Sequence, residues 1–256
     1  MARLPRRLGH AEEATLAEHL DELRGRIFVM LGALVVGTIV AFVFHVRLLH
    51  WLTRPLPAGH QKLFALGVAE PLTVVLTLSV YAGFLLALPV ILWQLWAFFA
   101  PAVDPAAQRK VVGLAAFGVS LAAAAVAFGY WVLLPRALHF LTNYDNAQFT
   151  HPIQARSYLS FVTALLLGIV VVFQTPLIVT GLVSLGVLSS RMLRKQRRLG
   201  YLVTAAVALA LPGPDPVTTF LELLPMWILF ESSIWLAVLV ERRRRRLIPS
   251  SATLGG

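Results

Sequence analysis

Residues 70–101, EPLTVVLTLSVYAGFLLALPVILWQLWAFFAP, decide the fold. Between Glu70 and Asp104 the chain contains no Asp, Glu, Lys, Arg or His. A helix over this stretch, at about 1.5 Å per residue, reaches roughly 50 Å and exceeds the roughly 30 Å of bilayer hydrocarbon. The stretch therefore predicts a membrane helix that tilts, bends or protrudes, and Pro89 near its middle predicts a kink.

The composition extends this interpretation to the whole chain. Of its 256 residues, 58% are hydrophobic and only 13% are charged, with a mean hydropathy of +0.78; soluble domains carry about 25% charged residues. The chain has no cysteine, which excludes disulfides, thiolate catalysis and cysteine-ligated metal sites. We expect one membrane domain over residues 16–246, between tails at 1–15 and 247–256.

Five further apolar runs complete an all-α membrane protein with six predicted spans. Residues 16–27 should already be helical, because their leucines fall on one face. Pro135 is expected to end the third span, and Gln174 with Pro176 should kink the fourth. The fifth rises only about 20 Å, too little for an undeformed bilayer. The spans are 27–46, 70–101, 111–134, 157–190, 199–211 and 217–240.

The basic residues predict the orientation of these spans. Of the 22 Lys and Arg residues, 17 lie on the side of the two termini and 5 on the other. Cytoplasmic loops carry the excess of positive charge, so both termini should be cytoplasmic. The net charge of +10 is explained better by this topology than by nucleic-acid binding. We interpret residues 242–246, all arginine, as an anchor to anionic lipids.

Several sequence pieces, taken in order, resemble the TatC family, the multi-spanning component of twin-arginine protein translocases. The resemblance covers residues 16–241 and implies a cupped bundle of six helices with short fifth and sixth helices. It also implies a non-enzymatic receptor for signal peptides with paired arginines. Such receptors move folded proteins with single-span TatA- or TatB-type subunits and the proton-motive force, as homo- and hetero-oligomers. The pieces are HLDELRGRI (19–27), ALPVILWQLWAFFAP (87–101), FGYWVLLP (128–135), SYLSF (157–161), QTP (174–176), LPGPD (211–215), Pro225 and Phe230-Glu231.

Within this resemblance, Glu22 matches the glutamate that contacts the signal peptide at the cytoplasmic end of the first span. A carboxylate can accept two parallel bonds from a guanidinium, which distinguishes arginine from lysine. Asp21 and Arg24 are the accompanying candidates. The alternative is that Glu22 only pairs with Arg26, four residues later on the same helix.

The family usually carries a second glutamate in the loop after the second span, just before a basic pair. Here that position falls on Ala107 or Gln108, so the motif is broken. We hypothesise that Asp104, the only acid in the loop, supplies part of the missing charge. Its alternative role is that of a turn or capping residue before Pro105.

Four polar residues at or within the later spans are candidates for partner contacts. Gln174 stands where the family carries Glu or Gln, and its amide could bond the backbone freed by Pro176. Glu231 and Asp215 match family acids, whereas Glu222 departs from the usual apolar residue. Nine positions separate Glu222 from Glu231, so an unbroken helix points them about 180° apart.

The alternative function is a solute or ion transporter, with an intramembrane pathway through Gln174, Glu222 and Glu231. An enzyme is disfavoured because no nucleophile motif is visible. The histidines show no metal-binding spacing, and no metal or other cofactor is expected.

Overall fold

The computed structural model describes residues 16–56, 63–99, 111–143, 153–212 and 216–247, and this part of the chain is almost entirely helical. Its only β contact is an isolated parallel bridge between Phe64 and Gln154. The helices are α1 Leu16–Val43, α2 His45–Thr53, α3 Glu70–Phe99, α5 Val111–Phe128, α6 Leu134–Asn143, α7 Ala155–Phe173, α8 Thr175–Ser184, α9 Ser190–Lys195, α10 Arg197–Ala210 and α11 Pro216–Leu247, with the π-helix η2 Gly129–Leu133 between α5 and α6.

Five helical segments are long and apolar enough to cross a membrane. They confirm five predicted spans, and α10 in the remaining one has 14 residues, as its short apolar run predicted. The implied short sixth helix is not found, because α11 has 32 residues and continues past Pro225. The five segments are Leu20–Val43, Glu70–Phe99, Val112–Asn143, Ala155–Ser184 and Pro216–Arg242.

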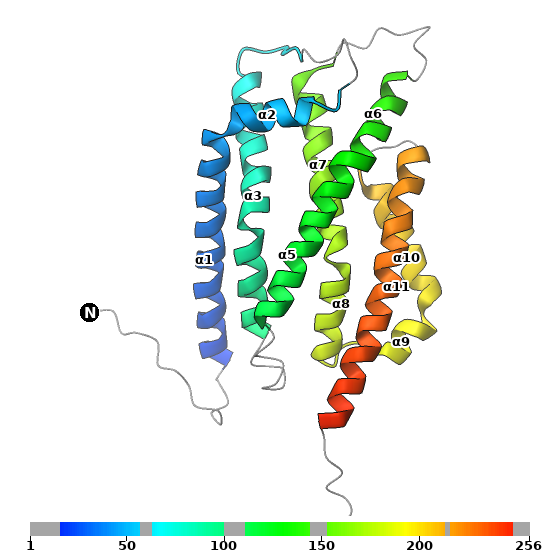
Figure 1. Ribbon diagram of the computed structural model, residues 1–256. Helices are drawn as coiled ribbons and strands as arrows, with labels where there is room; N and C mark the ends of the chain where they lie inside the picture. Colours follow the sequence, from blue (N-terminus) through cyan, green and yellow to red (C-terminus); the bar gives the residue numbers. More distant parts are fainter. Residues whose placement is uncertain (1–15, 57–62, 100–110, 144–152, 213–215, 248–256) are drawn as a thin grey trace, which may run out of the picture.

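Figure 1 shows that α1 begins and α11 ends at the same, lower side of the molecule. The two ends of the described membrane domain are therefore on one side of the molecule. The basic helix α9 lies at this side too, whereas α2 crosses the upper ends of the neighbouring helices.

The prediction that Pro135 ends the third span is wrong. The helix passes from α5 through η2 into α6 and ends only at Asn143. Proline lacks an amide hydrogen and its ring clashes with the preceding turn of an α-helix. The wider π-helical turn just before Pro135 accommodates it. Residues 136–143, expected in a loop, are therefore helical.

The fourth span breaks where predicted. Helix α7 ends at Phe173 and α8 begins at Thr175, so Gln174 separates them. Pro176 sits in the first turn of α8, where its missing amide hydrogen costs nothing. Pro89, in contrast, lies inside α3 without ending it.

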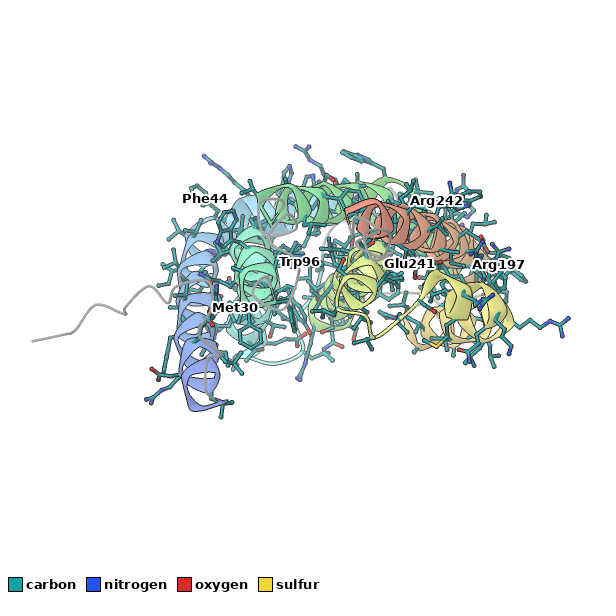
Figure 2. The ribbon with its side chains drawn as sticks, turned by 90° about the horizontal axis from the view of Figure 1, so that it is seen from below. Met30, Phe44, Trp96, Arg197, Glu241 and Arg242 are labelled. Atoms are coloured by element: carbon teal, nitrogen blue, oxygen red, sulfur yellow. The ribbon has the colours of Figure 1, made fainter. Side chains whose placement is uncertain are left out.

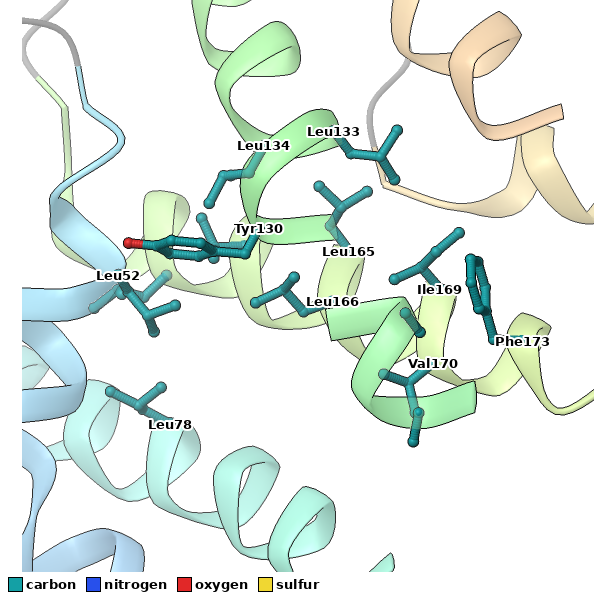
Figure 3. Packing of buried hydrophobic residues seen from close by; sticks show 14 of the residues in the cluster. Leu52, Leu78, Tyr130, Leu133, Leu134, Leu165, Leu166, Ile169, Val170 and Phe173 are labelled. Carbon is teal, nitrogen blue, oxygen red and sulfur yellow. The ribbon is translucent and has the colours of Figure 1, made fainter. Parts of the chain in front are cut away.

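The core is built around α7. Val162, Leu165 and Ile169 on this helix are completely buried, and residues of α2, α3, η2 and α6 pack against the same cluster (Figure 3). Helix α1 lies at the edge, and only 11% of its membrane window is buried. Helix α7 is therefore at the centre of the bundle, and α1 is at its periphery.

Two tyrosines fix α2 across the upper end of the bundle. The hydroxyl of Tyr130 donates to the carbonyl oxygen of Trp51 at 2.7 Å, and that of Tyr158 donates to the carbonyl oxygen of Leu52 at 2.6 Å. These carbonyls lie in the last turn of α2, where intrahelical donors run out, and the Trp51 carbonyl also accepts the Arg54 backbone amide at 3.4 Å. The Trp51 and Tyr130 rings also stack at 3.8 Å. The amphipathic helix is therefore held by hydrogen bonds at its C-terminal end.

Glu70 ties the start of α3 to the start of α7. One carboxylate oxygen accepts the backbone amides of Leu66 at 2.7 Å and Gly67 at 3.3 Å. The other accepts the Gln154 side-chain amide at 2.9 Å and the Arg156 backbone amide at 3.2 Å. These four bonds compensate for the burial of the carboxylate.

Candidate functional site

The predicted glutamate lies near the lower end of α1 and holds a guanidinium. The Nε and Nη2 atoms of Arg26 both donate to the same carboxylate oxygen of Glu22, at 3.0 and 2.5 Å. The Nη1 atom of Arg26 donates to the side-chain oxygen of Gln94 on α3 at 3.0 Å. The alternative prediction of a pair between Glu22 and Arg26 is therefore confirmed, and α3 completes it.

This ion pair is partly exposed at the surface of the molecule. The Glu22 side chain keeps 38% of its surface exposed, and the Arg26 side chain keeps 22%. Ion pairs four residues apart on one helix contribute about 0.2–0.5 kcal/mol to its stability. A second guanidinium can therefore compete for Glu22 at small cost to the fold.

The other two candidates on α1 are exposed. Asp21 and Arg24 both face solvent, and the Arg24 guanidinium lies 5.7 Å from the centre of the Phe28 ring. Beside Glu22 and Arg26, they give this end of α1 two acids and two bases. The remaining candidates Asp104, Gln108 and Asp215 lie outside the described residues.

Gln174 links two helices. Its side-chain nitrogen donates to the carbonyl oxygen of Gly118 on α5 at 3.2 Å, and 7% of the residue is exposed. The prediction that this amide bonds the backbone freed by Pro176 is therefore corrected. The break between α7 and α8 lets the amide reach the adjacent helix instead.

Glu231 joins α11 to α10. It accepts a short hydrogen bond from the Tyr201 hydroxyl, and its second oxygen lies 3.3 Å from a guanidinium nitrogen of Arg197. A carboxylate within an apolar helix is thus neutralised by partners from a neighbouring helix, as intramembrane charges require.

Glu222 occupies a separate place on the same helix, and only 1% of its surface is exposed. Because α11 continues unbroken past Pro225, Glu222 and Glu231 point about 180° apart. Gln174 contacts α5, whereas Glu231 contacts α10. The three residues predicted for a transport pathway do not form one site.

Sequence reasoning missed four residues that complete these clusters. Gln94 and Tyr201 are isolated polar residues within apolar runs, and this isolation is the sequence feature that could have identified them as contact residues. Arg197 was counted only as a basic loop residue. Glu241 directly follows the last predicted span, and it accepts the Ser190 backbone amide and hydroxyl, each at 2.6 Å.

Seen from below, α1 lies at one edge of the molecule, and Arg197, Glu241 and Arg242 lie towards the opposite edge (Figure 2). Helix α9 begins at Ser190, so Glu241 places a negative charge at the N-terminus of this basic helix. Within the described ranges, no group of three His, Cys, Asp or Glu residues could hold a metal ion.

A family model described as Sec-independent protein translocase protein (TatC) matches residues 18–225. This chain belongs to the TatC family. The TatC pieces seen in the sequence therefore mark a shared origin and fold, and the chain is a membrane protein of a protein translocase family.

Individual relatives agree with this assignment. The chain is 37% identical to Sec-independent protein translocase protein TatCd of Bacillus subtilis, over 92% of this chain and 96% of the relative. It is 32% identical to TatC of Carboxydothermus hydrogenoformans, over 89% and 94%. A crystal structure described as the twin arginine translocase receptor TatC has a TM-score of 0.76 and 30% identity, and the match covers 88% of this chain and 100% of that one. The TatC assignment thus rests on sequence and on three-dimensional structure.

Proposed function

We propose that this TatC chain is the receptor subunit that binds twin-arginine signal peptides and helps to export folded proteins. One observation carries the proposal: the Glu22 side chain is 38% exposed, and its carboxylate already accepts two guanidinium N–H groups from Arg26. An arginine from a signal peptide offers the same planar group. Lysine offers a rounded ammonium, which cannot reproduce the forked arrangement.

The contact with Gln94 suggests how the site exchanges partners. When a signal arginine takes Glu22, Arg26 can keep its hydrogen bond to Gln94, because that bond uses a different guanidinium nitrogen. The displaced arginine then retains one partner. Asp21 and Arg24 border the site, and Asp104 and Gln108 are proposed to line it from the loop after α3.

The cellular setting is part of the same proposal. Both termini lie in the cytoplasm of a prokaryote, and the chain resides in its plasma membrane, since the basic residues gather on the side of the termini. Single-span TatA- or TatB-type subunits are the proposed partners, in homo- and hetero-oligomers driven by the proton-motive force. Gln174, Glu222, Glu231 and Asp215 are proposed partner contacts, and the chain acts without chemistry of its own.

A crosslinking comparison tests the receptor role. Signal peptides with Arg-Arg or Lys-Lys, carrying a photoreactive group, are added to membranes that contain the wild-type chain, Glu22→Gln or Asp21→Asn. We expect wild type to prefer Arg-Arg by about tenfold, the effect of one bidentate charged pair. Glu22→Gln should abolish this preference, and Asp21→Asn should largely keep it. Equal labelling by both peptides in wild type would refute the proposal.

A further inference from the structure

A cavity of about 360 Å³ lies between α3 and α5, on the lower side of α2. Leu85, Leu88 and Pro89 form its wall on α3, and its lining is mainly apolar. The volume is within the range of about 300–1,000 Å³ that small-molecule sites occupy. Both helices belong to segments that are long and apolar enough to span a membrane, so a groove on their outer side faces the bilayer.

Small side chains on α5 create the space. Residues that line it recur three and four positions apart, and three of them are Ala122, Ala123 and Ala127. Ala123 is exposed, so the cavity is a groove open to the lipid side. From Val119 to Trp131 the wall runs for about 18 Å of helix.

Two stacked aromatic side chains, Trp51 and Tyr130, close the upper end of the groove and form its lid. Trp51 and Tyr130 line the groove and stack at 3.8 Å with an interplanar angle of 6°, and a hydrogen bond joins them. A partner helix with a diameter of about 10 Å could not follow the groove past this lid. An acyl chain is thinner and ends inside the bilayer, so it fits.

A cationic group stands beside the lid. Arg54 follows the last turn of α2 and is exposed, and its backbone N–H donates to the carbonyl oxygen of Trp51, a residue that lines the groove, at 3.4 Å. Trp131 lines the groove and keeps 69% of its surface exposed. Tryptophan and arginine are side chains that anchor at the interface between hydrocarbon and headgroups. The positive charge of Arg54 beside the groove complements the negative charge of a lipid phosphate.

We propose that this groove binds one acyl chain of an anionic phospholipid whose headgroup contacts Arg54. Basic residues near the surface attract anionic headgroups. The small alanine side chains of α5 let the acyl chain pack closely against this helix. A bound lipid would fill the space between α3 and α5 and support α2 from below. The inference is independent of the signal-peptide proposal, because none of its residues belongs to the Glu22 site.

Photolabelling tests the groove. The full chain is reconstituted in phosphatidylcholine vesicles that contain a little phosphatidylglycerol with a diazirine in one acyl chain, and the adducts are mapped by mass spectrometry. Ala123→Leu fills the groove, whereas Ala124→Leu adds the same volume at an exposed position of the same helix that does not line it.

We expect adducts to concentrate on the groove walls of α3 and α5. Ala123→Leu should reduce them about fivefold and Ala124→Leu should not change them. Arg54→Gln, at an exposed site that should not affect folding, should lower labelling by phosphatidylglycerol about threefold but not labelling by a phosphatidylcholine probe. Labelling that follows the exposure of every helix and is insensitive to Ala123→Leu would mean annular lipid only and would overturn the proposal.

Discussion

Gly37 of α1 meets Gly83 of α3 so closely that a Cβ atom on Gly37 would lie 2.5 Å from the Gly83 carbonyl oxygen. The converse holds as well, since a Cβ on Gly83 would lie 2.5 Å from the Thr38 amide nitrogen. Backbone atoms cannot move aside as a side chain tip can. Small residues thus allow the two helices to approach closely, and this contact holds the peripheral helix that carries Glu22.

Gly83→Ala should therefore displace α1 from α3. We expect it to destabilise the protein by about 1–3 kcal/mol, the usual cost of overpacking, and to lower the thermal midpoint in detergent. Gly32→Ala is the matched control, because a Cβ there would meet nothing within 4 Å. Equal midpoints for the two variants would contradict this account of the contact between α1 and α3.

Gln94→Ala should weaken signal-peptide binding if Arg26 uses Gln94 as its second partner. Without that acceptor, the displaced guanidinium loses one hydrogen bond, worth about 0.5–1.5 kcal/mol. We expect the apparent Kd for an Arg-Arg peptide to rise about two- to tenfold. Gln94→Glu keeps an acceptor and should restore binding; a loss as large as that of Gln94→Ala would argue against the exchange.

Removing the tyrosine hydroxyls should loosen α2. Tyr158→Phe leaves the Leu52 carbonyl without its tyrosine donor, at a cost of about 1–3 kcal/mol. Tyr130→Phe should cost less, because the Trp51 carbonyl keeps its bond from the Arg54 backbone amide at 3.4 Å. Hydrogen exchange of α2 amides should then become faster. Tyr81 on α3 has no hydrogen bond within the described ranges, so Tyr81→Phe is the control. Unchanged exchange in both hydroxyl variants would show that stacking and burial alone hold α2.

A double-mutant cycle can measure the link between α10 and α11. Tyr201→Phe combined with Glu231→Gln should show a coupling of about 1 kcal/mol, near the values measured for hydrogen bonds within membranes. Ser232 bonds the Leu229 carbonyl of its own helix at 2.8 Å. Pairing Tyr201→Phe with Ser232→Ala should therefore show no coupling, and a similar coupling in both cycles would count against a direct bond.

Much of the fold was predictable because membrane insertion depends on local composition. The uncharged run after Glu70, the short run in α10 and the break at Gln174 are all properties of neighbouring residues, and each appears in the structure. Pro135 was misjudged because a π-helical turn can absorb a proline, and sequence does not reveal that choice. The pairing of Glu22 with Arg26 was predicted, but the contact of Arg26 with Gln94 on another helix was not.

The sequence by itself determined which segments are buried in lipid and that they are helical, because charged groups and unpaired backbone groups are costly in hydrocarbon wherever they occur. Only the tertiary structure decided the partners of each polar side chain. Arg26 reaches Gln94 across 68 positions, and Gln174 reaches Gly118 across 56. Such pairs form only where two helix faces lie side by side. The packing between helices, for example the close contact of Gly37 with Gly83, decides which faces meet, and no single segment of sequence specifies it.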